Sequence, residues 1–198
     1  MNKDKALESV NEIKELMEKS SRFVSLSGFT AIIAGIYALA GAYTVAHVLT
    51  PDTRLIVALQ TSIVIAALVF GASAITAIIL SYYKSKRISQ KFFSRLTYRA
   101  LWHFALPLFA GGALCLSMLW NGYYGILSSA MLVFYGLAQV NVSKYSYSSL
   151  AWLGYAFILL GIVDSIVGGH SLLFWSIGFG GFHIIYGILF YICIEKKK

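Results

Sequence analysis

The sequence predicts an all-α integral membrane protein: a bundle of six transmembrane helices with cytoplasmic N and C termini. The first observation is composition, since 59% of the 198 residues are hydrophobic and only 12% are charged, with a mean hydropathy of +0.75. Soluble domains are nearer half apolar and a quarter charged. Such a composition excludes a soluble fold, whose surface must stay polar, and a disordered chain. The second and third observations are the long charge-free intervals and the one-sided distribution of Lys and Arg.

The charge-free intervals count the helices. Residues 23–51 and 55–83 carry no charged side chain, and each is long enough for one helix, because roughly 20 residues cross the hydrocarbon. Residues 100–143 and 145–194 are much longer, and only the second holds a charged residue, Asp164. Each of these two intervals must therefore contain a pair of helices.

Turn residues divide the two long intervals. Asn121-Gly122 and Gly168-Gly169 are typical of turns, and Pro51 closes the first helix. We therefore expect a short N-terminal segment at 1–22 and a transmembrane domain at 23–198. The expected spans are about 23–49, 55–83, 100–120, 123–142, 148–167 and 172–194.

Lys and Arg orient these spans. Arg54 is alone on its side of the predicted topology, and the other Lys and Arg residues lie on the opposite side. The positive-inside rule then places both termini in the cytoplasm, which predicts a multi-pass protein of the bacterial inner (plasma) membrane. The net charge of +8 reflects this topology. It favours membrane lipids with anionic headgroups as partners, and no nucleic-acid-binding motif is present.

Small residues recur at every seventh position in several spans. The first span has Gly28, Gly35 and Ala42, and the fifth has Gly154 and Gly161. Because lipid gives helices no hydrophobic reason to associate, small residues that allow close backbone approach predict helix contacts. A transport hinge is the alternative interpretation of these glycines, and their shared spacing leaves an internal repeat open.

Residues 3–22 form a predicted amphipathic helix, with Ala6, Val10, Ile13 and Met17 along one face. Equal numbers of acids and bases favour contact with a protein over an anionic membrane. The protein is therefore expected to form a homo-oligomer or to bind a membrane or cytosolic protein partner through this segment. A solvated extension of the first span is the alternative.

Residues 84–99 are strongly basic, and their cations fall at helical spacing. They are candidates for contact with lipid headgroups, namely Lys84, Arg87, Lys91 and Arg95. The alternative is that the flanking helices protrude and turn, and that the charges only set the topology.

Polar groups inside membrane spans are costly, and each calls for a functional hypothesis. His183 lies at the midpoint of the sixth span, Tyr37 and Tyr135 lie at similar depth, and Tyr186 is one turn away. These residues are the predicted ligand-binding or polar-network group. The alternative is a neutral structural histidine satisfied by a tyrosine or by a backbone carbonyl.

A second group lies near the predicted outer surface. Asp164, His47 and His170 share a depth there and could hold a proton or a metal. Their spacing matches no metal-binding motif, so the sequence predicts no metal site. An aspartate that reaches toward water is the alternative.

The sequence predicts no catalytic residue and no cofactor. His103 and His183 lie at different depths, which disfavours a haem held between them, and the final helix has no lysine for a retinal Schiff base. Six helices with Ser128 or Ser129 on the fourth and His183 on the sixth resemble rhomboid proteases in arrangement. That resemblance implies an intramembrane serine hydrolase. However, Gly125-Ile-Leu-Ser128-Ser129 departs from the GxSG spacing of that family, and His183 lacks its AHxxG context.

The abundance of aromatic residues and the scarcity of charges inside the spans favour neutral or lipophilic contacts. We therefore expect a non-enzymatic membrane protein that binds a lipid-like or small neutral ligand, or a partner membrane protein, in an accessory or sensing role. The alternative is a small oligomeric transporter or channel coupled through intramembrane His or Asp. An intramembrane serine hydrolase is the remote alternative.

Overall fold

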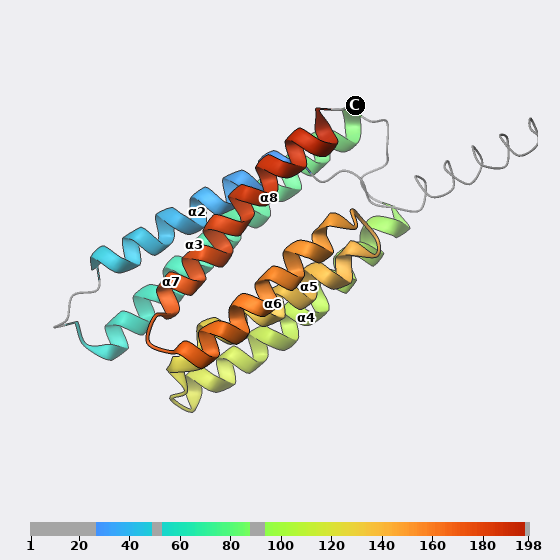
Figure 1. Cartoon of the computed structure of the whole chain (residues 1–198). Helices are drawn as coiled ribbons and strands as arrows, with labels where there is room; N and C mark the ends of the chain where they lie inside the picture. The colour runs from blue at the N-terminus through green and yellow to red at the C-terminus, as the bar shows by residue number, and fades with distance from the viewer. Residues whose placement is uncertain (1–26, 49–52, 88–93, 197–198) are drawn as a thin grey trace, which may run out of the picture.

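The computed structural model describes residues 27–48, 53–87 and 94–196, and within them the chain is helical with no β-strand. Figure 1 shows the helices. The last of them contains two short π-helical segments. In chain order the elements are α2 (Gly28–Val48), α3 (Leu55–Arg87), α4 (Arg95–Trp120), η1 (Tyr124–Ile126), α5 (Leu127–Ser143), α6 (Ser149–Val167), α7 (Ser171–Trp175), η2 (Ser176–Phe182), α8 (His183–Phe190) and η3 (Tyr191–Glu195).

The predicted all-α bundle of six membrane-spanning helices is confirmed. Six helices of the described chain are long and apolar enough to cross a membrane, and Ser171–Glu195 counts as one of them. Three boundaries differ from the prediction by several residues: α2 begins at Gly28, α3 continues to Arg87 and α4 begins at Arg95. Basic residues stabilise the last turn of α3, and Ser94 caps α4 by accepting a hydrogen bond from the Thr97 amide at 3.2 Å. The predicted segment 1–22 and Lys91 lie outside the described residues.

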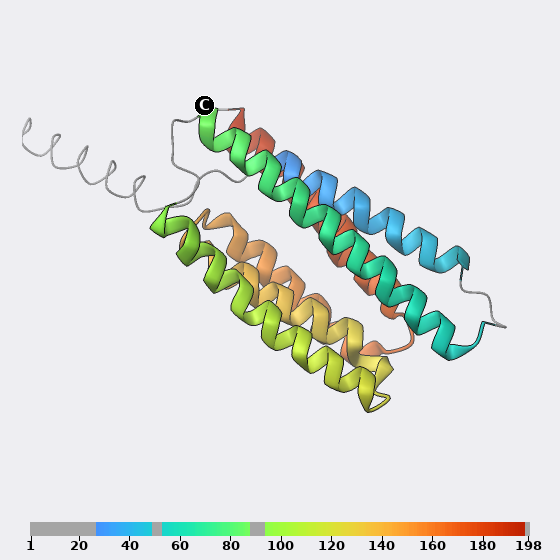
Figure 2. The same cartoon turned by 180° about the vertical axis from the view of Figure 1, so that it is seen from behind.

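The helices form two groups of three. In one group α2 packs between α3 and α8, and in the other α5 packs between α4 and α6. Figures 1 and 2 show these two halves lying alongside each other. The halves contact each other where α5 and α6 meet α7 and η2. We call this boundary the seam.

Glycine contacts join the helices within the first half. A Cβ atom added to Gly28 would lie 2.6 Å from the Gly187 carbonyl oxygen, and one added to Gly35 would lie 2.8 Å from that of Gly180. These pairs align α2 with the last helix in antiparallel fashion. The seven-residue spacing therefore marks a helix contact, as predicted, because only glycine allows the backbones to approach so closely.

The second half uses the same device. Gly136 and Gly154 face each other, and a Cβ atom on either would lie 2.6 Å from the other's carbonyl oxygen. Gly161 lies seven residues after Gly154, and a Cβ atom added to it would lie 2.9 Å from the carbonyl oxygen of Ser129. Gly168 continues the spacing in sequence but ends α6 in a turn with φ of +64°.

The outward surface of the bundle is apolar. Residues such as Phe70, Ile75 and Ile78 on α3 and Phe109 and Leu116 on α4 are exposed. Contiguous apolar patches of this extent are not stable in water. Together with the six apolar spans, they indicate a multi-pass membrane protein.

Candidate functional site

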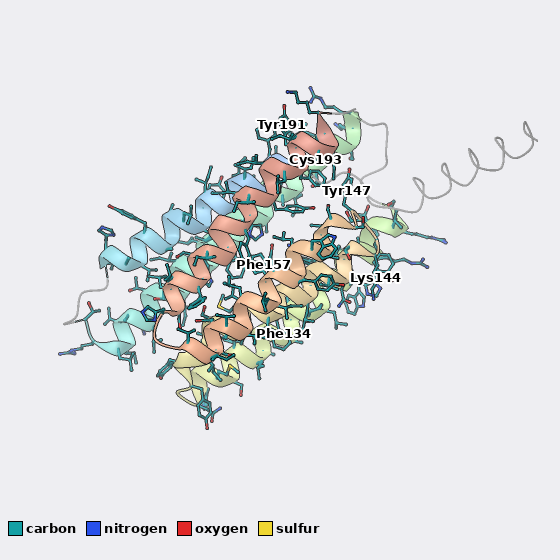
Figure 3. The ribbon with its side chains drawn as sticks, in the orientation of Figure 1. Phe134, Lys144, Tyr147, Phe157, Tyr191 and Cys193 are labelled. Carbon is teal, nitrogen blue, oxygen red and sulfur yellow. The ribbon has the colours of Figure 1, made fainter. Side chains whose placement is uncertain are left out.

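The seam is filled by aromatic side chains. Phe157 of α6 is fully buried at its centre and meets Phe179 and Phe182 of η2 at ring distances of 5.3 and 5.7 Å. Figure 3 places Phe157 in the middle of the bundle. Leu132 and Leu153 complete the buried cluster. The two halves are thus held together by apolar packing, into which a few polar groups are set.

A chain of three polar side chains crosses the seam. Gln139 of α5 donates from Nε2 to the Tyr135 hydroxyl at 2.8 Å, and that hydroxyl lies 2.7 Å from His183 Nε2 at the start of α8. Tyr135 accepts from Gln139, and its single O–H is then available to donate to His183 Nε2. In that arrangement Nε2 is the acceptor and the proton of a neutral ring lies on Nδ1.

Nδ1 of His183 makes no hydrogen bond of good geometry. The atom is buried and has no hydrogen-bond partner, although it lies near the carbonyls of Gly178 and Phe179. A buried N–H without an acceptor costs about 1–3 kcal/mol. Nδ1 is therefore a poorly satisfied donor surrounded by aromatic rings, with only these backbone carbonyls near it, and it would suit an acceptor oxygen of a bound molecule.

The local sequence explains how His183 comes to lie there. It follows the π-helical segment Ser176–Phe182, whose sequence holds three glycines. A Cβ atom at Gly178 would lie 2.5 Å from Leu132 and 3.1 Å from Phe157, so this glycine lets the last helix close onto the second half. π-Helical turns occur often at functional sites, because they re-aim the side chains that follow.

The predicted polar group is only partly assembled. His183 and Tyr135 are brought together, whereas the Tyr37 hydroxyl lies 3.5 Å from Thr76 of α3. Tyr186 pairs with Ser149 across the seam at 2.9 Å. Gln139 was not predicted. The sequence does contain a signal for Gln139, because it lies four residues after Tyr135 and therefore on the same face of the helix.

The predicted outer group is not assembled. Asp164 is 1% exposed and accepts a hydrogen bond at Oδ2 from Ser129 at 2.8 Å. His47 and His170 are exposed and pair with backbone carbonyls of their own segments. In the described ranges no three His, Cys, Asp or Glu side chains gather as metal ligands. Asp164 thus faces α5 and does not reach toward water, because Gly161 brings the two helices together.

The two serines of the hydrolase hypothesis pair elsewhere. Ser128 donates to the Ser171 carbonyl at 3.1 Å, and Ser129 donates to Asp164. His183 Nε2 is occupied by Tyr135. A nucleophile needs its base within hydrogen-bond reach, and neither serine is paired with His183 here.

A polar cluster closes the end of the bundle where Gly28 and Glu195 lie, which we call the terminal end. Glu195 pairs with Lys84 of α3 and accepts from the Gly28 amide at 3.3 Å. Lys84, a predicted headgroup contact, is thus engaged within the protein, while Arg87 and Arg95 are exposed.

Burial, and then the charge of Glu195, raise the pKa of Tyr147 in the α5–α6 loop.

A shallow groove lies at the opposite end. It has a volume of about 350 Å³ and is mostly apolar, with a wide opening. α2 and the α7–η2 region line it with Leu39, Ala42, Tyr43, Ala46, Leu172, Leu173 and Ser176. It contains none of the polar seam residues.

Comparison of the chain with protein-family models, with curated proteins and with solved structures finds no match.

Proposed function

We propose that this protein is a non-enzymatic membrane protein that binds a lipid-like or small neutral ligand at the seam, in an accessory or sensing role. The observation that carries the proposal is the buried Nδ1 atom of His183, which makes no hydrogen bond of good geometry and lies among aromatic rings. Binding sites for small molecules are mainly apolar and hold a few well-placed polar groups. The seam has this composition.

The polar side chains of the seam are uncharged, and this favours a neutral ligand. The polar groups at its centre are the imidazole of His183, the phenol of Tyr135 and the amide of Gln139. A charged ligand would lose its hydration there without gaining an opposite charge. A carbonyl, ether or hydroxyl oxygen on an apolar or ring-bearing body would accept from Nδ1 and lie against the aromatic side chains.

The arrangement of the halves supports access from the bilayer. Among the described helices, α3 packs mainly on α2 and α4 mainly on α5, with no extended contact between α3 and α4. Figure 2 shows these two helices on the same side of the bundle. A lipophilic ligand concentrated in the membrane would approach Tyr135 between them.

The charge distribution supports a cytoplasmic location for both termini in the bacterial inner membrane. The two described chain ends meet at the terminal end, where Glu195 accepts from the Gly28 amide. Exposed cations at the helix ends nearby include Lys86, Arg87 and Arg95. The positive-inside rule assigns such an end to the cytoplasm. Anionic lipids are the partners expected there, and segment 3–22 remains a candidate protein-binding surface.

Native mass spectrometry of the protein released from mild detergent tests the proposal. The wild type should carry a neutral lipophilic molecule. His183→Leu should lower its occupancy, because losing a buried hydrogen bond of about 1.4 kcal/mol raises the Kd about tenfold. The matched control His47→Leu, at an exposed histidine, should keep it. Equal occupancy in wild type and His183→Leu would refute the seam as the binding site.

A transporter is the second candidate, and the buried carboxylate Asp164 favours it, since intramembrane acids commonly carry coupling ions. Reconstituted liposomes separate the two functions. A transporter must produce a solute flux that depends on Asp164, whereas a binding protein produces none.

A further inference from the structure

Asp164 is the most deeply buried acidic side chain in the described residues, and its carboxyl is only half satisfied. It is 1% exposed, and Oδ2 accepts from Ser129 at 2.8 Å. Oδ1 is buried with no hydrogen-bond partner. This arrangement lies one helical turn before α6 ends at Val167, within a membrane-spanning helix.

No basic side chain of the described chain compensates Asp164. The ion pair found in the described chain joins Lys84 to Glu195 at the terminal end, away from Asp164. His47 and His170 are exposed and pair with backbone carbonyls of their own segments. A carboxylate buried in low dielectric without an opposite charge costs several kcal/mol. The free oxygen therefore calls for a positively charged partner that the protein itself does not supply.

The possible cation ligands identified on α5 and α6 are oxygens. The Ser129 hydroxyl contacts the carboxylate, and the Ser129 carbonyl faces α6 one turn away at Gly161. Ser128 donates to the Ser171 carbonyl in the same region, just beyond the turn that ends α6. Oxygen donors bind hard cations and have little affinity for transition metals.

We propose that Asp164 and Ser129 form a binding site for one alkali cation, Na⁺. One carboxylate with one monovalent cation is neutral, whereas a divalent cation would leave a net charge in the low-dielectric interior. α5 packs so closely on α6 that the Ser129 carbonyl oxygen would lie 2.9 Å from a Cβ atom added to Gly161. This close packing favours Na⁺ over the larger K⁺.

Thermal unfolding of the full chain in detergent tests this site. The unfolding midpoint should rise with NaCl and saturate, compared with choline chloride at equal ionic strength, because a ligand that binds only the folded state stabilises it. KCl should act at higher concentration. Asp164→Asn should remove the sodium response, and Ser129→Ala should weaken the apparent affinity about tenfold. The control His170→Gln should respond as the wild type does.

Identical wild-type midpoints in sodium and choline would overturn the proposal, and so would a sodium response that persists in Asp164→Asn. Equilibrium binding of radioactive sodium to the wild type does not depend on whether that variant folds. Saturable binding of one ion per chain supports the site, and binding no greater than in a protein-free sample refutes it. Neither measurement involves the seam ligand, so the two proposals stand or fall separately.

Discussion

The hydrogen-bond direction around His183 follows from donor counting. Gln139 donates to Tyr135, and the single proton of that hydroxyl is left for His183 Nε2. The imidazole is thereby held in one neutral tautomer, with its remaining proton buried on Nδ1. In this tautomer the imidazole can donate from Nδ1 without a change in its own protonation.

Tyr147 makes the folded protein less stable at alkaline pH. Burial, and then the charge of Glu195, raise its pKa above the ordinary value of about 10. The stability that neutral Tyr147 contributes is fully present below pH of about 10. It is lost as pH rises through the folded-state pKa, because the folded protein then binds more protons than the unfolded chain.

The unfolding midpoint of the wild type should therefore fall more steeply above pH of about 10 than that of Tyr147→Phe. The two proteins should run parallel at lower pH. Tyr123→Phe, at an exposed tyrosine between two spans, serves as the control and should follow the wild type. Parallel curves for the wild type and Tyr147→Phe over the whole alkaline range would contradict the assignment.

The depth of a side chain along its helix could be predicted from the sequence, but which helices lie next to each other could not. Depth alone placed His183 level with both Tyr135 and Tyr37, yet Tyr37 lies near Thr76 of α3. The choice between the two depends on which helices pack together. Asp164 is a similar case, since its pairing with Ser129 depends on the closeness of α5 and α6 and not on its own depth.

At the scale of the helices, small residues decide which pairs pack closely. α2 packs on the last helix through Gly28 and Gly35, and α6 packs on α5 through Gly154 and Gly161. The seven-residue spacing predicted these faces because it is visible in sequence. It could not name the partner helix, since four spans carry similar spacing.

Gly161→Leu should destabilise the protein by about 1–3 kcal/mol, the usual cost of overpacking. Even a Cβ atom there would lie 2.8–3.0 Å from Val133, Ser129 and Leu132. The matched control is Gly112→Leu on α4, where an added Cβ atom meets nothing within 4 Å. Unfolding in detergent with increasing denaturant measures both variants. Equal loss of stability in the two would show that α5 and α6 do not depend on this contact.

At the scale of the whole molecule, the six spans could be predicted because charge and hydropathy mark them directly. The grouping into two halves could not, because it depends on contacts between helices far apart in the chain. The π-helical segment before His183 was also missed, since the glycines that permit it predict only small size. The poorly satisfied Nδ1 donor of the seam is a product of that segment.

Labelling with an impermeant thiol reagent tests the orientation of the bundle. With Cys115 and Cys193 replaced by serine, Asn121→Cys or His170→Cys should react from outside intact cells, because both residues lie at the end opposite the terminal end. Lys86→Cys, near the terminal end, should react only after the cells are permeabilised. The reverse pattern would contradict the positive-inside assignment.

The central claim is that the seam binds a neutral ligand through His183, and a density map of the purified protein in lipid nanodiscs tests it most directly. We expect non-protein density against the His183 ring, with a polar atom within hydrogen-bond distance of Nδ1, and its loss in His183→Leu. A well-resolved seam in which protein side chains alone surround His183, the same in both proteins, would contradict the claim.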